Sequence, residues 1–167
     1  MERIMIIGCG GAGKSTLARK LGKKTDLPVI HLDQIYWSPG NWQHLENEEF
    51  DTLLIKELEK QRWILDGNFN RTMELRLEKC DTVIYLDFNR LICIWGWLKR
   101  VISNWGKSRP DMGPECREWF DPEFARWLWN FNKQNRARYL KILADQNDKS
   151  VYILKNRRQV RKFLNQL

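Results

Sequence analysis

The sequence has few residues of the kinds that build metal sites and disulfide frameworks. Its four cysteines form no C-x-x-C pair, and only two histidines, His31 and His44, accompany them. Zinc sites and disulfide-stapled scaffolds depend on closely spaced cysteines or histidines, so neither is expected here. We predict reduced thiols, with Cys80 and Cys93 in the core, and structural or exposed histidines.

Long apolar runs are also absent. The longest stretch, Leu91 to Leu98, is eight residues long even when Gly96 is counted, whereas a helix needs about 20 apolar residues to cross a bilayer. The first apolar run begins at Ile4, which leaves no room for the regions of a signal peptide. We therefore expect no membrane partner and a cytoplasmic location.

Size and composition fit a globular enzyme or binding protein. The 167 residues are 43% apolar and 30% charged, which suits one domain over residues 1–167 with a substantial core. No internal repeat or low-complexity segment interrupts this domain. The oligomeric state is not readable from the sequence.

Positive charge is concentrated in the second part of the chain. Residues 1–97 carry 13 Lys and Arg against 14 Asp and Glu, whereas residues 98–167 carry 16 against 7. Such an excess favours a polyanionic partner, either nucleotide phosphates or nucleic acid. Charge alone does not choose between them.

A phosphate-binding pattern, G-x-x-x-x-G-K-[ST], follows the apolar run Ile4 to Ile7. Its glycines allow successive N–H groups to point into one concavity at the start of a helix. We predict that Lys14 bridges the β- and γ-phosphates of ATP and that Ser15 offers its hydroxyl to Mg²⁺. The alternative is a glycine-rich turn that matches by chance. The predicted nucleotide-binding residues of this loop are Gly8, Cys9, Gly10, Gly11, Ala12, Gly13, Lys14, Ser15 and Thr16.

Apolar runs alternate with segments of helical spacing along the whole chain. This alternation predicts an α/β fold, a three-layer P-loop NTPase with a five-stranded parallel sheet. The predicted strands are Ile4 to Ile7, Pro28 to Leu32, Trp63 to Leu65, Val83 to Leu86 and Val151 to Leu154. The predicted helices are Ser15 to Leu21, Glu48 to Gln61, Leu91 to Ile102 and Asp121 to Ala144.

Polar residues follow the second and third predicted strands, where the ligand crevice of such a sheet lies. Asp33 is placed to orient or deprotonate an acceptor hydroxyl, and Asp66 suits a magnesium-bound water. Arg71 would reach the same crevice as a phosphate clamp. The alternatives are helix-capping aspartates and a solvated arginine.

One irregular insertion, residues 103–120, carries glycines and prolines together with basic residues. With Arg100 just before it and Arg109 within it, the insertion is a candidate lid that adds positive charge and excludes water during phosphoryl transfer. The alternative is a solvated basic loop.

Aromatic residues are abundant, with nine tryptophans. Phe124, Trp127, Leu128 and Phe131 keep the spacing of a helix face packed on a core. With the interleaved arginines they are also compatible with a surface that stacks on single-stranded bases, and we favour core packing. Trp37 and Trp42 are candidates for lining an acceptor pocket.

The motifs together resemble a known group of enzymes. The order phosphate loop, HLDQIYW, PGNW, WILDGNF with Arg71, DTVIYLDFNR and KSRPDM resembles adenylate-kinase-like P-loop kinases, and most of all the bacterial group called DNA topology modulation proteins. The resemblance implies a donor site at Gly8 through Thr16 and acceptor-side roles for Asp33 and Arg71. It also implies a magnesium role for Asp66, lid roles for Arg100 and Arg109, and a donor base near Asn156 and Arg157. Asn68-Phe69-Asn70 stands where nucleoside monophosphate kinases have F-P.

The leading hypothesis is an ATP- and Mg²⁺-dependent phosphotransferase that acts on a small molecule, a nucleotide or nucleoside. A nucleotide-regulated DNA-binding protein that affects DNA topology is the alternative. No helix-turn-helix or other groove-reading motif is visible, so we expect only weak, non-specific DNA association. A plain NTPase with water as acceptor is the third possibility.

Overall fold

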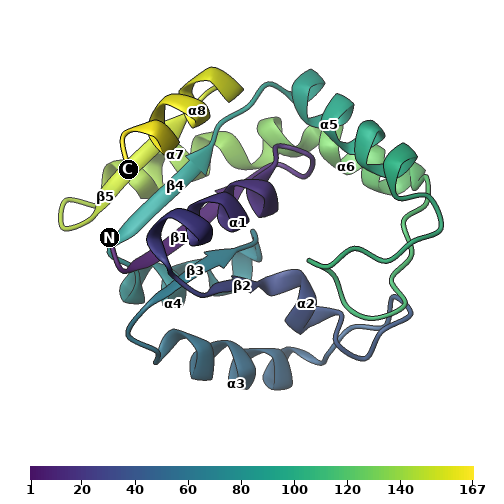
Figure 1. Cartoon of the computed structure of the whole chain (residues 1–167), viewed down its shortest axis with the longest axis horizontal. Coiled ribbons are helices and arrows are strands. Elements are labelled where there is room, and N and C mark those ends of the chain that lie inside the picture. Colours follow the sequence, from purple (N-terminus) through teal and green to yellow (C-terminus); the bar gives the residue numbers. More distant parts are fainter.

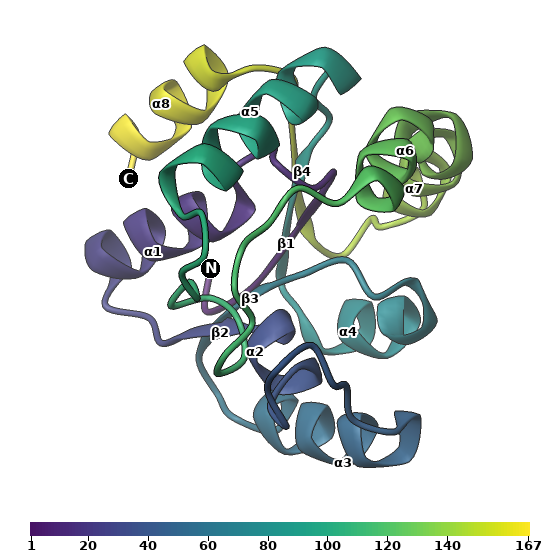
Figure 2. The same cartoon turned by 90° about the vertical axis from the view of Figure 1, so that its right-hand side faces the viewer.

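The computed structural model describes residues 1–167 and has a central parallel sheet covered by helices on both faces (Figures 1 and 2). The five strands are β1 Arg3–Gly8, β2 Val29–His31, β3 Trp63–Asp66, β4 Thr82–Leu86 and β5 Ser150–Leu154. They are ordered β2-β3-β1-β4-β5, and every neighbouring pair is parallel. All five predicted strands, and with them the predicted α/β fold class, are confirmed.

The helices lie in two layers. Figure 2 shows α1 and α8 on one side of the sheet and α4, α6 and α7 on the other, with α5 at one end of the molecule. The helices are α1 Lys14–Thr25, α2 Leu32–Tyr36, α3 Asn47–Leu58, α4 Met73–Lys79, α5 Arg90–Ser103, α6 Pro122–Phe131, α7 Ala137–Ala144 and α8 Arg157–Asn165. A short 3-10 turn, Asn70–Thr72, precedes α4.

The core forms where the central strands meet both helix layers. Ile4, Met5 and Ile6 of β1 have no exposed surface, and neither do Ile64 and Leu65 of β3. Strands covered on both faces need continuous apolar runs rather than alternation, which is the pattern that these strands show. No helix is long and apolar enough to cross a membrane.

The segment predicted as one helix over residues 121–144 is interrupted. A π-helical turn, Asn132–Arg136, joins α6 to α7. Within it Asn132 Nδ2 donates to the Phe88 carbonyl at 3.0 Å, and Arg136 pairs with Asp87 at 2.8 and 2.9 Å. The turn therefore ties α6 and α7 to the carboxyl end of β4.

Candidate active site

The phosphate-loop residues form a tight turn between β1 and α1. Gly8, Gly11 and Gly13 have φ angles of 144°, 73° and 97°, in the region that favours glycine. Gly13 directly precedes α1, which begins at Lys14. Residues 10–16 line a cavity of about 880 Å³, so the positive N-terminal end of α1 faces that cavity.

This turn packs directly on α5 and α6. A Cβ added to Gly10 would lie 2.8 Å from Leu128 Cδ2. A Cβ on Gly11 would overlap the Cys93 carbonyl, and one on Gly96 would overlap the Gly11 carbonyl. The two backbones therefore touch, and α5 is held in a fixed position relative to the phosphate loop.

Cys9 takes part through its backbone rather than its thiol. Its carbonyl accepts a hydrogen bond from Lys14 Nζ at 3.3 Å. The thiol is buried against Cys93, and the hydrogen bond between the two thiols together with burial raises the pKa of Cys9. A protonated, buried thiol is a poor nucleophile, and all four cysteines are buried and free.

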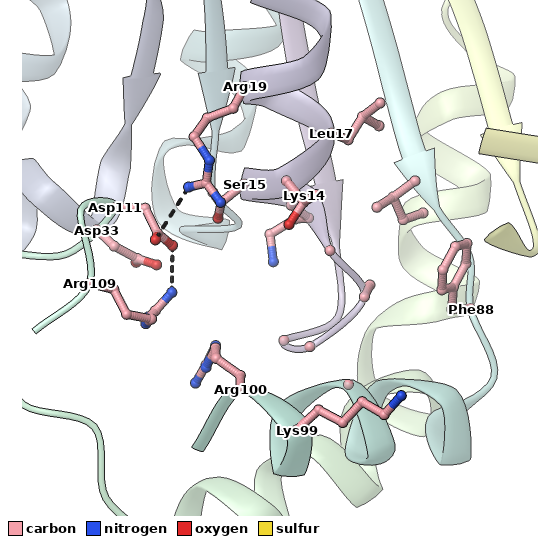
Figure 3. Close-up of a pocket in the computed structure, with 18 of the residues that line it drawn as sticks. Lys14, Ser15, Leu17, Arg19, Asp33, Phe88, Lys99, Arg100, Arg109 and Asp111 are labelled. Carbon is pink, nitrogen blue, oxygen red and sulfur yellow. Dashed lines mark hydrogen bonds and ion pairs between the residues drawn. The ribbon is translucent and has the colours of Figure 1, made fainter. Parts of the chain in front are cut away.

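The cavity is strongly basic. Only Asp33 and Asp111 contribute negative charge to its lining, whereas eight basic side chains line it: Lys14, Arg19, Lys20, Lys99, Arg100, Arg109, Arg157 and Arg161. Figure 3 shows Lys14, Arg100 and Arg109 directed toward the same space from three different elements. A concave site with this charge attracts polyanions such as nucleotide phosphates.

The two predicted crevice carboxylates lie at the ends of neighbouring strands. Asp33 lines the cavity, and burial together with the Asp66 carboxylate raises the pKa of Asp33. Asp66 is buried and is not part of the cavity lining; its Oδ2 lies 2.9 Å from His31 Nδ1, and its Oδ1 has no hydrogen-bond partner. The helix-capping alternative is wrong for both, because the N-caps of α2 and α4 are His31 and Thr72.

The insertion brings a further carboxylate to the phosphate loop. Asp111 is almost completely buried, lies 3.4 Å from Arg19 Nη1 of α1 and accepts a hydrogen bond from Arg109 Nη1 at 2.5 Å. Burial acts to raise the pKa of Asp111, but the charge of Arg109 and the nearby Ser15 hydroxyl and Arg19 outweigh it and lower that pKa. Figure 3 shows Asp111 between Arg19 and Arg109. The sequence placed Asp111 on the insertion without indicating this contact.

Arg109 and Arg100 share a buried acid within the same network. Arg109 Nε donates to Glu118 Oε1 at 2.8 Å, and Arg100 Nε lies 3.1 Å from the same oxygen. Glu118 is almost completely buried. The positions of these two predicted lid arginines are therefore fixed by an acid that the sequence reasoning missed.

The insertion also contacts the segment that follows β2. Gln34 Nε2 donates to the Pro110 carbonyl, and Asn41 N donates to the Pro114 carbonyl at 3.0 Å. A Cβ on Gly113 would overlap the Trp37 carbonyl, so the two backbones touch there as well. The insertion thus runs from the end of α5 to the segment after β2, and part of it, including Arg109, Pro110 and Asp111, lines the cavity.

Asn68 and Arg76 fix the segment after β3. Asn68 Nδ2 donates to the Gly8 carbonyl at 2.8 Å, and its Oδ1 accepts from Gly8 N at 3.0 Å. Arg76 has no exposed surface and donates to the Gly67 and Phe69 carbonyls at 2.9 Å each. Burial lowers the pKa of Arg76 to about 10. Sequence reasoning missed the contacts of both residues. The presence of Asn68 where nucleoside monophosphate kinases have another residue was a signal for the first.

Some predicted site residues lie outside the cavity lining. Arg71 is bound to Asp51 of α3 at 2.5 and 2.7 Å and contributes nothing to the lining. Asn156 accepts a hydrogen bond from Gln159 N as the N-cap of α8, whereas Arg157 lines the cavity. Gly8 and Cys9 form the base of the loop rather than its lining.

The aromatic face of α6 serves two purposes. Leu128 and Phe131 are buried in the core, as predicted, while Phe124 and Trp127 line the cavity next to Gly10. Trp37 packs edge-on against Tyr36 and Trp42, with ring centroids 4.9 and 5.5 Å apart, and neither Trp37 nor Trp42 lines the cavity.

Comparisons with known proteins agree with this architecture. No family model matches the chain. It is 36% identical over 80 residues, 47% of its length, to an adenylate kinase from Caldanaerobacter subterraneus subsp. tengcongensis, and the match covers 34% of that relative. Its structure resembles a shikimate kinase from Bacteroides thetaiotaomicron with a TM-score of 0.60 and 17% identity, covering 99% of this chain and 95% of the other.

These observations define the class of fold. The protein has a P-loop kinase-like fold. This follows from its five-stranded parallel sheet, from the glycine-rich turn at the N-terminus of the first helix, and from the structural likeness to a shikimate kinase over nearly the whole chain. Fold alone does not establish an activity, because one fold carries many functions.

Proposed function

We propose that this protein is a small-molecule kinase that transfers the γ-phosphoryl group of ATP. The observation that carries the proposal is the joining of three features in one cavity: the N-terminus of α1 with Lys14, the arginines Arg100 and Arg109, and the carboxylate of Asp33. Phosphoryl transfer needs a phosphate cradle, positive charge over the transferring group and a positioned acceptor. The cavity offers a residue for each.

Nucleotide phosphates would occupy the turn of residues 10–16. Backbone N–H groups and the helix end bind the phosphate oxygens there, and Lys14 Nζ leaves the Cys9 carbonyl to bridge the β- and γ-phosphates. Arg157 at the start of α8 lines the same cavity, so the donor base would lie near this end, as the sequence predicted.

The residues present also fit Mg²⁺. Asp66 Oδ1 is a buried carboxylate oxygen without a partner, at the end of the strand that pairs with β1 just before the phosphate loop, and an oxygen of this kind suits a magnesium-bound water. Ser15 is the hydroxyl that would contact the ion directly. Bound Mg²⁺ neutralises phosphate charge during transfer.

The acceptor would be held on the side of Asp33. Its raised pKa, caused by burial and by Asp66, makes it a better proton acceptor for a hydroxyl group than an ordinary carboxylate. Arg100 and Arg109, which line the same cavity, stabilise the charge on the transferring group. Arg71 would join the acceptor site only after leaving Asp51. The acceptor we favour is a nucleotide or nucleoside.

The resemblance to DNA topology modulation proteins raises DNA binding as an alternative. Part of the basic excess that suggested it, including Lys99, Arg100, Arg157 and Arg161, lines the nucleotide cavity instead of forming a separate face. This placement favours a kinase over a DNA-binding protein that uses nucleotide as a regulator.

An acceptor panel tests the proposal. ADP release with Mg²⁺ and ATP would be measured in the presence of nucleoside monophosphates, nucleosides and small hydroxyl compounds, with an Arg109→Ala variant as comparison. We expect one class of compound to stimulate ADP release well above the acceptor-free rate, and Arg109→Ala to remove most of that stimulation. ADP release that no compound stimulates would leave water as acceptor and contradict the proposal.

A further inference from the structure

Helix α5 carries an apolar stripe that is largely exposed. Leu91, Trp95 and Ile102 are 61%, 58% and 74% exposed, among the highest values for large apolar residues in the chain, and Leu98 between them is half-buried. In Figures 1 and 2, α5 lies at the periphery and no other element lies on its outer side.

The stripe is separate from the two faces of α5 that already have partners. Cys93, Trp97 and Val101 are buried in the core. Gly96 and Lys99 line the nucleotide cavity. At 100° per residue the four stripe residues fall within about 60° of one another, so they form a third, narrow face.

A narrow stripe of this kind fits another helix. Helices that pair along a seam use apolar residues spaced four and three apart, as in 91, 95, 98 and 102. Helices that lie on a membrane surface need a much wider apolar face. The width of the stripe therefore favours a helical partner.

The spacing of the four stripe residues along α5 allows the stripe to pair with the same stripe on a second copy of the protein. The intervals are four, three and four, so the pattern reads the same in both directions. When two copies of α5 cross antiparallel about a two-fold axis near Gly96 and Trp97, Leu91 meets the other copy's residue 102, and Trp95 meets residue 98. A two-fold interface requires this self-complementarity.

The exposed apolar area is of the right size for such an interface. At the fractional exposures of Leu91, Trp95 and Ile102, these side chains present on the order of 400 Å² per copy. A standard interface buries about 800 Å² per partner, of which a little over half is apolar. Antiparallel crossing also aligns the two helix dipoles favourably.

We propose that the protein forms a symmetric dimer in which the α5 helices of two copies pair antiparallel through Leu91, Trp95, Leu98 and Ile102. The interface lies on the helix that touches the phosphate loop, but it uses no cavity residue. The proposal is therefore independent of the proposed kinase activity.

Introducing opposite charges at the two ends of the stripe tests both the dimer and the register in which the two helices pair. The variants are Leu91→Lys, Ile102→Glu and the double variant that carries both changes. Within one chain these positions are about 16 Å apart along the helix axis, so the new charges can pair only between copies. Ile55→Glu, at a 44% exposed position on α3, is the matched control.

Sedimentation velocity over a dilution series from micromolar to submillimolar protein provides the readout, and circular dichroism confirms folding. We expect the wild type and Ile55→Glu to dimerise, each single variant to dissociate at least about tenfold more readily, and the double variant to recover most of the loss. A wild type that stays monomeric throughout would overturn the proposal, as would a double variant no better than the single ones. Monomers that bind vesicles of phosphatidylcholine and phosphatidylglycerol through α5 would also overturn it, in favour of a membrane surface.

Discussion

At the residue scale, Lys14 is the side chain on which the proposed chemistry depends most. It lines the cavity and has only one hydrogen bond, to the Cys9 carbonyl. We predict that Lys14→Met lowers kcat on the order of a hundredfold or more, because one charge-assisted contact made in the transition state contributes about 3 kcal/mol. Initial rates at saturating ATP measure the effect. Lys24→Met, at an exposed position on the same helix, serves as control.

Retained folding is part of this prediction. Lys14 is not in the apolar core, so the melting temperature of Lys14→Met should stay within a few degrees of the wild type. Wild-type turnover in a well-folded Lys14→Met variant would remove the basis for the proposed phosphate contact.

We expect Asp33 to contribute to activity and, when it is ionised, to lower the stability of the folded protein. Its folded-state pKa is raised by burial and by Asp66, so the unfolded chain releases this proton at lower pH than the folded protein does. Its contribution to stability therefore declines as pH rises from the ordinary carboxyl range through the raised folded-state pKa. Asp33→Asn should lower turnover by on the order of a hundredfold, because a positioned base is lost.

The same variant should melt at a higher temperature than the wild type at neutral pH and at nearly the same temperature at a pH below the ordinary carboxyl range. Calorimetry at the two pH values measures both comparisons. Equal destabilisation at both pH values would show that Asp33 supports packing rather than bearing an unfavourable buried charge.

At the element scale, the close backbone contact between the phosphate loop and α5 leads to a prediction. Alanine is favoured over glycine inside a helix by about 1 kcal/mol, so helix propensity alone predicts that Gly96→Ala stabilises the protein. A Cβ there would overlap the Gly11 carbonyl. We therefore predict the opposite sign, a destabilisation of roughly 1–3 kcal/mol.

Urea unfolding would measure the free energy of unfolding for Gly96→Ala and for Lys56→Ala on the exposed face of α3. The control should stay within about 0.5 kcal/mol of the wild type. A more stable Gly96→Ala protein would mean that α5 and the phosphate loop separate readily, contrary to the packing described above.

The insertion is the second element with a testable role. If it closes over the nucleotide as a lid, Arg109→Ala should reduce kcat far more than it weakens ATP binding, by on the order of a hundredfold against a few-fold. Single-turnover kinetics measures the loss in phosphoryl transfer, and equilibrium titration with ATP measures the loss in binding. Equal losses in both would make Arg109 a residue of ground-state binding.

Sequence patterns predicted the elements that have a strong internal signal. The central strands were found because both faces are buried and their residues are continuously apolar, as in Ile4 to Ile7. Helices α2 and α4 were missed because they are only five and seven residues long, and α8 was missed because its polar sequence buries only Phe163 and Leu164. Local patterns carry little information on such segments, whose positions depend on tertiary contacts.

The candidate site likewise contains residues that the sequence could predict and residues that it could not. The loop from Gly10 to Thr16 could be predicted because its chemistry is local to one turn and one helix end. Asp111 pairs with Arg19 from 92 positions further along the chain, and Glu118 joins Arg100 to Arg109 only after the insertion has folded. Contacts between distant segments leave no spacing in the sequence, so only the structure reveals them.

At the scale of the whole molecule, the distribution of charge distinguishes a kinase from a DNA-binding protein. Residues 98–167 carry 16 basic against 7 acidic residues, and several of the basic ones line the cavity. We predict weak DNA association that falls by orders of magnitude between about 50 and 200 mM salt, because it depends on counterion release. Phosphoryl transfer inside the cavity should change little over that range.

Fluorescence anisotropy with DNA of several sequences, run beside the kinase assay at each salt concentration, makes this comparison. Tight binding to one sequence at physiological salt, retained in Lys14→Met, would move the functional site from the cavity to the outer basic surface.

The central claim is that the γ-phosphoryl group is transferred to an organic acceptor at this cavity. The most direct measurement follows the label from γ-³²P-labelled ATP in the presence of Mg²⁺ and each acceptor, with separation of organic phosphate products from inorganic phosphate. We expect labelled organic product with one class of acceptor, in amounts equal to the ADP formed, and almost none with Lys14→Met. Label recovered only as inorganic phosphate, or equal product from Lys14→Met, would contradict it.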